Sequence, residues 1–281
     1  MKLAMIDDQM LPFSELDKAY LDRGLYFGDG VYEVLRSYDG RIFAFEEHLA
    51  RFERSLREIF IHGVDIADIR RRVQTAFEQS GHANAKIYFH ITRGSEPRSH
   101  LPGKDLKPNF FLTVESLTED TTAKTQGISV QTHPDLRWKR CDIKSLNLLP
   151  NVLAKLAVQS QNASEAILVN DANEITEGAG SAFFAIDGKE NVLITRPLGP
   201  EILPSITRAM VGKVAEDIGL AIVERVQSPQ EAAACDELFL GVTTKDIVPI
   251  TRFNGQAVGD GQVGPICKKL MAEFAEFARG R

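Results

Sequence analysis

One lysine and one acid are the residues of this chain whose types and surroundings best suit covalent chemistry. Lys144 lies in a mixed polar and apolar run at 137–147, and Glu177 stands in the middle of a Thr-Glu-Gly segment further along the chain. An amine can hold an aldehyde as a Schiff base, and a carboxylate can keep a pyridine nitrogen protonated; pyridoxal phosphate requires both groups. Each residue alone has a plainer interpretation, as a surface lysine or as part of a turn. Together they indicate a pyridoxal-phosphate site.

A phosphate-binding region is indicated by one arginine and by two segments that carry hydroxyl groups. Arg51 lies on a predicted helix, on a face distinct from the apolar one. The segment Ser-Ile-Thr at 205–207 opens a helix directly after a proline, and helix N-termini bind phosphate through their free amides. Thr243 follows a predicted strand and could add a hydroxyl. For the segment 205–207 alone, a helix cap without a ligand is the simpler interpretation.

A short basic loop is the next candidate for binding. Arg98 and His100 stand two residues apart in a stretch, 94–103, that also contains two glycines and two prolines. Two donor side chains on a stiffened loop can grip one carboxylate. The alternative is an exposed basic loop without a ligand.

Periodicity in the sequence predicts the elements that must position these residues. A hairpin turn is predicted at 38–41, and strands are predicted at 31–37, 42–45, 86–92, 110–115, 128–132, 165–169, 181–186, 191–195, 221–226 and 237–241. Apolar residues at three- and four-residue spacing predict helices at 49–59, 69–77, 151–161, 205–218 and 262–279. The polar segment 119–126 shows no buried periodicity, so we expect a linker there.

The composition fits an ordinary globular protein and limits its partners. The 281 residues suffice for roughly two domains, with 43% hydrophobic and 26% charged residues. A net charge of −6 argues against nucleic acid as a partner, because phosphate binding favours a basic face. The one basic cluster, Arg70–Arg72, lies beside apolar residues of a predicted helix and is expected to be its solvated face.

The cysteines and the length of the apolar stretches indicate the cellular compartment of the protein. The three cysteines have neither a metal-binding spacing nor an even disulfide framework, so we expect no metal and reduced thiols. No apolar stretch approaches the length of a membrane span, and Asp7 and Asp8 stand where a signal peptide would be apolar. We therefore expect no membrane partner and a cytoplasmic location.

The segment R-W-K-R-C-D-I-K-S-L-N at 137–147 resembles the lysine segment of the class IV pyridoxal-phosphate aminotransferases, and most closely that of the D-amino-acid transaminases. Five further segments stand in the family's order: F-G-D-G-V-Y-E at 27–33, E-H-L-A-R at 47–51, T-R-G-S-E-P-R-S-H at 92–100, T-E-G at 176–178 and I-T-R at 206–208. Because the ordered segments span nearly the whole chain, they are much more specific together than any one of them is.

The resemblance implies an α/β protein with two domains and fold type IV, like the D-amino-acid aminotransferases. We expect a smaller N-terminal α/β domain at 1–118, a linker at 119–126 and a larger C-terminal domain at 127–281 that carries the Schiff-base lysine. The resemblance also implies a homodimer.

Roles for individual residues follow from the same resemblance. Lys144 would hold the aldehyde of pyridoxal 5′-phosphate and then move a proton between the substrate Cα and C4′ of the cofactor, while Glu177 would face the ring nitrogen. The residues expected around the phosphate are Arg51, Ile206, Thr207 and Thr243. The residues expected to hold the substrate α-carboxylate are Tyr32, Arg98 and His100, the last two reaching in from the partner subunit.

The implied reaction is transfer of an amino group between a D-amino acid, such as D-alanine or D-glutamate, and a 2-oxo acid. The pair formed by Arg98 and His100 favours the D-amino acid. Alternatives with the same fold are an L-branched-chain aminotransferase and a 4-amino-4-deoxychorismate lyase, neither of which is expected to need that pair. A binding protein that has lost catalysis is the alternative from another class. Loss of Lys144 or Glu177 would be its expected sign, and both are present.

Three positions depart from the pattern or leave it open. The family usually has an asparagine where this chain has Ala182, which puts one polar contact near the cofactor or substrate in doubt. Glu165 matches a family glutamate near the lysine, but an ion pair with Arg140 is an equally open interpretation. Cys141 is expected to be a packing residue.

Overall fold

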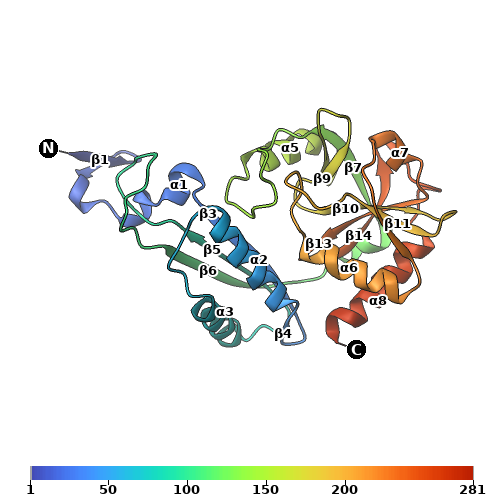
Figure 1. Ribbon diagram of the computed structural model, residues 1–281, viewed down its shortest axis with the longest axis horizontal. Helices are drawn as coiled ribbons and strands as arrows, with labels where there is room; N and C mark the ends of the chain where they lie inside the picture. The colour runs from blue at the N-terminus through green and yellow to red at the C-terminus, as the bar shows by residue number, and fades with distance from the viewer. Residues whose placement is uncertain (1, 281) are drawn as a thin grey trace.

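The computed structural model describes residues 2–280 and arranges them in two lobes, each built around its own sheet (Figure 1). The small lobe contains a four-stranded sheet from the first part of the chain, and the large lobe contains a nine-stranded sheet from the second part. The expected α/β architecture is confirmed. None of the helices within residues 2–280 combines the length and the apolar character that crossing a membrane requires.

The small sheet is antiparallel and is covered on one face by two helices (Figure 1). Its strands, in the order β4-β3-β5-β6, are β3 (Gly30–Tyr38), β4 (Arg41–Ile42), β5 (Ala85–Thr92) and β6 (Asn109–Ser116). The helices α2 (Phe45–Glu58) and α3 (Ile66–Ser80) bury alternate residues of β5, because successive side chains of a strand point to opposite faces. Phe52 of α2 meets Phe89 of β5 with ring centres 4.9 Å apart. Tyr32 lies on the other face and is only partly buried.

The large sheet mixes parallel and antiparallel strands in the order β12-β11-β10-β13-β14-β7-β8-β9, with β15 paired to β14. Its strands are β7 (Ile128–Pro134), β8 (Glu165–Val169), β9 (Ile175–Gly178), β10 (Ala182–Asp187), β11 (Val192–Thr195), β12 (Ala221–Glu224), β13 (Glu237–Val242), β14 (Asp246–Phe253) and β15 (Gln256–Ala257). The helices α6 (Ile206–Asp217) and α8 (Pro265–Arg279) share one apolar core with the sheet (Figure 1). Two short helices, α4 (Thr121–Gln126) and α7 (Pro229–Ala233), contribute to a second core, and α5 (Leu149–Gln159) packs on β8.

Residues 2–27 form an extension of the small lobe that periodicity did not predict. It consists of β1 (Leu3–Ile6), β2 (Gln9–Pro12), two short 3-10 helices at Phe13–Glu15 and Lys18–Leu21, and α1 (Arg23–Phe27). The strands are four residues long and pair only with each other, so they leave no long alternating pattern in the sequence.

Most predicted elements are confirmed, with ends that shift by a few residues, but the returning strand expected at 42–45 is confined to β4, and residues 43–45 do not continue it. Strand β4 ends at Ile42, and Ala44 adopts a left-handed conformation (φ 49°) directly before α2. The chain therefore turns into the helix instead of continuing along the sheet. The apolar residues at 42–45 lie at the start of that helix, and their partly buried side chains pack against the two neighbouring cores.

Strand β14 lies near the centre of the large sheet and was not predicted. Two features hide it: it is buried over most of its length, so it has no alternation, and it contains Pro249, which lacks the amide that a central strand normally donates.

The polar segment expected to be a linker contains a packed helix. Ala123 of α4 is buried in the core beside β14, and the Gly127 that ends the helix lies so close to Thr251 that a Cβ there would be 2.4 Å from its methyl carbon. The segment therefore packs against the core of the large lobe through this helix, although its polar sequence shows no buried periodicity. The division into residues 1–118, 119–126 and 127–281 stays a proposal, supported by the separate sheets on either side of this segment.

Candidate active site

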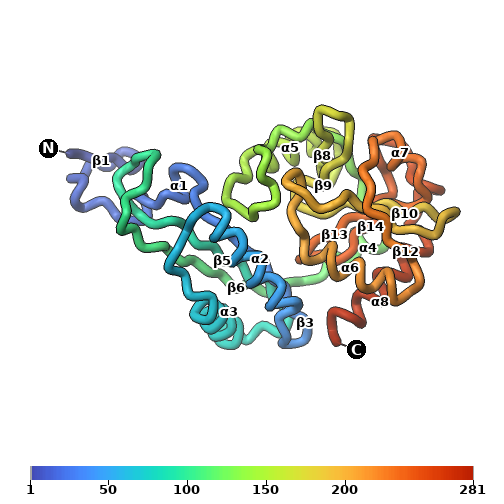
Figure 2. The backbone as a smooth tube through the Cα atoms, in the orientation of Figure 1, coloured from blue at the N-terminus to red at the C-terminus, as the bar shows by residue number. Residues whose placement is uncertain are grey.

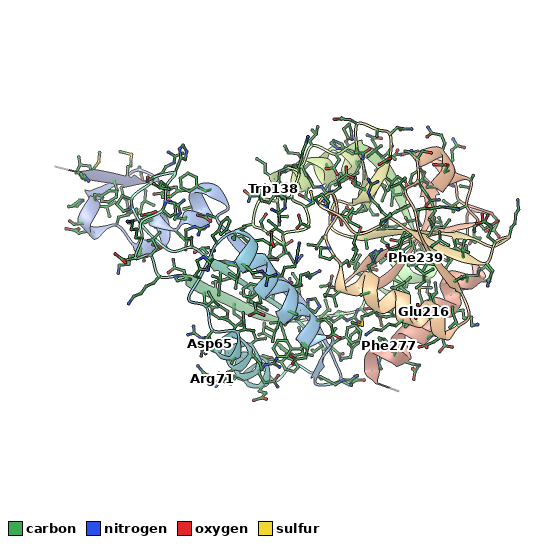
Figure 3. All side chains as sticks on the ribbon, in the orientation of Figure 1. Asp65, Arg71, Trp138, Glu216, Phe239 and Phe277 are labelled. Carbon is green, nitrogen blue, oxygen red and sulfur yellow. The ribbon has the colours of Figure 1, made fainter. Side chains whose placement is uncertain are left out.

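A cavity of about 120 Å³ is lined by residues of both lobes. Five of the residues singled out in the sequence line it: Tyr32, Arg51, Lys144, Glu177 and Thr243. Trp138, which also lines the cavity, lies at the junction between the lobes (Figure 3). Within residues 2–280, no three His, Cys, Asp or Glu side chains are grouped so that they could hold a metal ion.

Lys144 lies on a loop that extends from the large lobe and contacts the small lobe (Figure 2). Its carbonyl accepts a hydrogen bond from the amide of Tyr32 at 3.0 Å, and its own amide donates to the hydroxyl of Ser55 at 3.3 Å. The Lys144 Nζ lies 4.1 Å from the centre of the Tyr32 ring. Because the loop is bonded to β3 and α2, the amine has a fixed place on the cavity wall.

Glu177 lies on β9 and is almost entirely buried. One oxygen, Oε1, accepts hydrogen bonds from the guanidinium of Arg137 and from the amide of Leu203 at 3.2 Å. Burial raises the pKa of Glu177, and the positive charge of Arg137 opposes that rise. The other oxygen, Oε2, has no hydrogen-bond partner among residues 2–280, so this side of the carboxylate can accept a hydrogen bond from a ligand in the cavity.

Arg51 is held by a buried ionic network of the small lobe. Its Nε and Nη2 donate to the two oxygens of Glu33 at 2.8 and 2.7 Å, and Nδ1 of His48 lies 2.7 Å from the same carboxylate. Burial opposes ionisation of Glu33, but the charges and hydrogen bonds of Arg51 and His48 together outweigh it and lower the pKa of Glu33 to about 2. The Arg51 Nη1 donates to the carbonyl of Pro204 at 3.0 Å, which places the guanidinium beside the start of α6.

The start of α6 offers free amides next to that cation. Ser205 is the N-cap, and its hydroxyl accepts from the amide of Arg208 at 3.2 Å. The amides of Ile206 and Thr207 have no acceptor within the described part of the chain. Ser205 and Thr243 line the cavity; the side chains of Ile206 and Thr207 do not. A cation, two amides and two hydroxyls therefore converge where an anion such as phosphate would be stabilised.

Arg98 and His100 do not lie in this cavity. Both are exposed on the loop between β5 and β6, and both pack on Phe27: the Arg98 guanidinium carbon is 5.0 Å from its ring centre, and the His100 ring centre is 5.5 Å from it. Within one chain they do not join Tyr32. Their expected action from a partner subunit stays a prediction.

Two residues that sequence reasoning did not assign also line the cavity: Arg137, which pairs with Glu177, and Ser181. Arg137 stands at the start of the run that carries Lys144, but its partner lies 40 residues away and leaves no local pattern. Ala182 presents an apolar side chain to the cavity where the family usually has an amide. Cys141 also borders the cavity, and burial raises its thiol pKa to about 12. The thiol therefore stays protonated at neutral pH, in keeping with a packing role.

The ion pair considered between Glu165 and Arg140 is wrong. Glu165 pairs with Lys155 at 3.1 Å and accepts a hydrogen bond from the Ser181 hydroxyl at 3.4 Å. Arg140 instead pairs with Asp142 at 2.9 Å and with Glu58. Arg140 therefore has two carboxylate partners, one of them 82 residues away in the sequence, and Glu165 is neither of them.

The family model and the curated relatives that match this chain are all aminotransferases. Residues 30–253 match the model of the amino-transferase class IV family. The chain is 37% identical over 282 residues to the D-alanine aminotransferase of Staphylococcus epidermidis, covering 99% of this chain and 98% of that one. It is 36% identical over 270 residues to the D-alanine aminotransferase of Bacillus licheniformis, covering 95% and 93%.

Solved structures show the same fold. The branched-chain amino acid aminotransferase of Escherichia coli superposes with a TM-score of 0.87 at 23% identity, covering 98% of this chain and 93% of that one. The branched-chain aminotransferase of the archaeon Thermoproteus uzoniensis, solved with norvaline, gives a TM-score of 0.83 at 24% identity, covering 98% and 93%. Another branched-chain amino acid aminotransferase, solved with pyridoxamine 5′-phosphate, gives 0.87 at 20% identity, covering 97% and 92%. At these identities the likeness concerns the fold alone, and it confirms the expected fold type IV.

Proposed function

This chain belongs to the class IV aminotransferase family, and from that membership we propose that it transfers an amino group between a D-amino acid, such as D-alanine or D-glutamate, and a 2-oxo acid. The proposed cofactor is pyridoxal 5′-phosphate, with Lys144 as the Schiff-base lysine. Relatives more than 30% identical over nearly the full length are D-alanine aminotransferases, which supports the D-amino acid. The branched-chain enzymes support only the shared fold.

The observation that carries the proposal is the meeting of three different groups on one cavity. An amine (Lys144), a buried carboxylate with one free oxygen (Glu177) and a cation beside free helix amides (Arg51 and α6) fit the aldehyde, the ring nitrogen and the phosphate of the cofactor. When bound, pyridoxal phosphate withdraws electrons and stabilises negative charge on the substrate Cα. The cavity has an anchoring group for each end of that molecule.

Each of the chain's own residues in the site has a separate proposed role. Lys144 binds the aldehyde carbon and, once released, moves the proton at the substrate Cα. Tyr32 borders the amine and closes that wall of the cavity. Glu177 keeps a negative charge beside the ring nitrogen, and Arg137 holds its carboxylate in place. Arg51, the amides of Ile206 and Thr207, and the Thr243 hydroxyl bind the phosphate.

The α-carboxylate of the substrate is proposed to be bound by Tyr32 together with Arg98 and His100 of a second copy of the chain. This requires a homodimer. The exposed face of α5 supports one, because four apolar side chains there are each between 49% and 66% exposed: Leu149, Val152, Leu153 and Leu156. We place the protein in the cytoplasm, in keeping with three cysteines that are all free and buried within the described chain.

The homodimer is tested by placing charges on that face. We expect Leu153→Asp combined with Leu156→Asp to shift sedimentation from dimer to monomer, because a buried charge on an apolar interface is strongly unfavourable. Turnover of D-alanine should fall more than roughly tenfold although the cofactor stays bound. Val226→Asp, at an exposed apolar residue of the segment after β12, is the matched control. A fully active monomer would contradict both the dimer and the shared site.

Substrate handedness is tested with a panel of D- and L-amino acids against 2-oxoglutarate and pyruvate. We expect turnover of D-alanine and D-glutamate, and we expect Arg98→Ala to raise their KM more than fivefold with the cofactor absorption unchanged. The reason is the loss of a charge-assisted contact to the substrate carboxylate, about 1.5–3 kcal/mol. Arg98→Lys should restore binding only in part, because an ammonium lacks the planar fork.

A clear outcome would overturn the D-specific proposal. Efficient turnover of L-leucine with none of D-alanine would leave the branched-chain alternative standing. Release of pyruvate from 4-amino-4-deoxychorismate, without any amino transfer, would favour the lyase.

A further inference from the structure

The loop between β5 and β6 is held from inside by one buried arginine, Arg23, the first residue of α1. Its Nη1 donates to the side chain of Glu96 at 2.8 Å and to the carbonyl of Ser99 at 2.6 Å, and its Nη2 donates to the carbonyl of His100 at 2.9 Å. Arg23 is 3% exposed, whereas the residues of the loop tip are exposed. One guanidinium therefore binds the carbonyls of two consecutive peptide groups, the one that joins Ser99 to His100 and the one that follows it.

Arg23 is itself fixed, and a nearby aromatic residue of the same helix is the platform for the loop's side chains. The Arg23 Nε donates to Asp29 at 2.8 Å. Its guanidinium carbon lies 4.9 Å from the centre of the Phe27 ring, against which Arg98 and His100 also pack at 5.0 and 5.5 Å. The hydrogen bonds from Arg23 to the backbone and the packing on the Phe27 ring therefore both restrain the same two side chains, Arg98 and His100.

The base of the loop is closed by other contacts, so the Arg23 side chain is needed for the residues beyond them. Gly94 has φ +129°, and a Cβ there would lie 2.4 Å from the carbonyl oxygen of Lys107, so only glycine fits this close approach. The backbone amide of Arg23 donates to the carbonyl of Gly94 at 3.0 Å, the amide of Glu96 donates to the carbonyl of Leu21 at 3.0 Å, and the amide of Gly103 donates to Glu96 at 3.1 Å. The exposed residues 97–101 between these contacts are the part of the loop that the guanidinium holds.

We propose that Arg23 is a positioning residue for substrate binding: by holding the carbonyls of Ser99 and His100, it keeps the side chains of Arg98 and His100 directed at one carboxylate. The inference rests on the proposed function, in which those two side chains bind the α-carboxylate of a D-amino acid. Arginine suits the position because its planar group offers five donors in fixed directions. A lysine has one nitrogen and cannot span Glu96 and both carbonyls from the same place.

The kinetic test uses Arg23→Gln and Arg23→Lys in the cofactor-loaded enzyme. We expect the KM for D-alanine to rise roughly tenfold in Arg23→Gln, because a carboxylate clamp that is misplaced by a fraction of an ångström binds poorly. The kcat at saturating D-alanine should stay within about twofold, and the cofactor absorption should not change. Arg23→Lys should fall between the wild type and Arg23→Gln.

Arg93 provides a matched control. It also binds Asp29, at 2.9 and 2.8 Å, but its other hydrogen bonds go to the carbonyls of Ile59 and Phe60 at the end of α2. Arg93→Gln therefore removes a similar arginine from the same carboxylate without touching the loop tip. It should lower the melting temperature and leave the KM unchanged. An equal rise of KM in both variants would overturn the proposal.

The NMR order parameters of the backbone amides of residues 98–101 provide a readout that does not depend on the reaction. We expect them to fall below roughly 0.6 in Arg23→Gln and to stay unchanged in Arg93→Gln. If the wild type turns over no D-amino acid, the proposed function fails, and the order parameters still decide whether Arg23 holds the loop. A folded Arg23→Gln with wild-type order parameters and wild-type KM would overturn the inference.

A third variant keeps the test available if Arg23→Gln does not fold. Glu96→Gln weakens the same anchor from the loop side, at a side chain that is more exposed than Arg23, and leaves Arg23 paired with Asp29. It should produce the same rise in KM and the same fall in the order parameters, only smaller. The absence of both changes in Glu96→Gln would also count against the inference.

Discussion

Replacing Lys144 by alanine is expected to abolish transamination in a protein that remains folded. In the proposed function, the substitution removes both the attachment point for the cofactor and the proton carrier at the substrate Cα, so turnover should fall by more than roughly 10³-fold. The fold should survive because the contacts that fix this loop are made by the backbone of Lys144, to Tyr32 and Ser55, and do not involve the amine. Circular dichroism and the melting temperature check the fold, and single-turnover kinetics check the reaction.

A labelling experiment identifies the lysine directly. Borohydride reduction of the wild-type enzyme should fix the cofactor covalently on Lys144, as peptide mapping would show. Lys139→Ala is the matched control, because Lys139 is in the same segment but is exposed and does not line the cavity. It should keep its activity. Recovery of the label on any other lysine would rule out Lys144 as the attachment point.

The placement of Lys144 illustrates what the sequence alone could and could not predict. The residue type and its segment indicated the chemistry. Its position depends on backbone hydrogen bonds to Tyr32 and Ser55, which are 112 and 89 residues away. Such non-local pairing produces no periodic signal in either segment, so the sequence could indicate the amine but not the wall of the cavity on which it lies.

Ion-pair partners show the same limit. Glu177 could be singled out from its segment, but its partner Arg137 could not, and the partner considered for Glu165 was wrong. A charged side chain pairs with whichever opposite charge the fold brings within about 4 Å, and several candidates are usually available in the sequence. Where the structure buries the pair, as with Glu177, the choice of partner determines the electrostatics of the site.

Alternation and composition together decide which strands can be predicted; strands buried on both faces, such as β10 and β13, were still predicted from apolar runs that contain no proline. Strand β5 alternates between buried and partly buried residues, and its period of two could be read from the sequence. Strand β14 is buried on both faces and includes Pro249, so it shows neither alternation nor a typical composition. This difference matters for the site, because the turn between β13 and β14 carries Thr243.

Replacing Glu177 by glutamine is expected to slow removal of the Cα proton by on the order of a hundredfold, about 3 kcal/mol. The amide has nearly the same size, so the cavity should keep its shape. What is lost is the negative charge beside the ring nitrogen of the cofactor. Arg137 keeps a carboxylate partner in the variant, because Asp135 accepts from its Nη2 at 2.8 Å. The deficit should therefore appear in the rate and not as a collapse of the fold.

The matched control removes the other acid of the same cluster. Asp135→Asn takes a carboxylate from Arg137 and from the Thr176 hydroxyl, but Asp135 does not line the cavity. It should lower the melting temperature at least as much as Glu177→Gln does, while each half-reaction slows by less than about tenfold. This contrast separates loss of charge at the ring from loss of support for Arg137.

Both half-reactions must be measured, because the carboxylate serves each of them in the same way. The amino acid half-reaction and the oxo acid half-reaction both develop negative charge that the protonated ring stabilises, so Glu177→Gln should slow the two by similar factors. A variant that slows only one half-reaction would indicate a role in binding one substrate instead. Unchanged rates in both would remove Glu177 from the site, and the free oxygen that it directs into the cavity would then need another ligand.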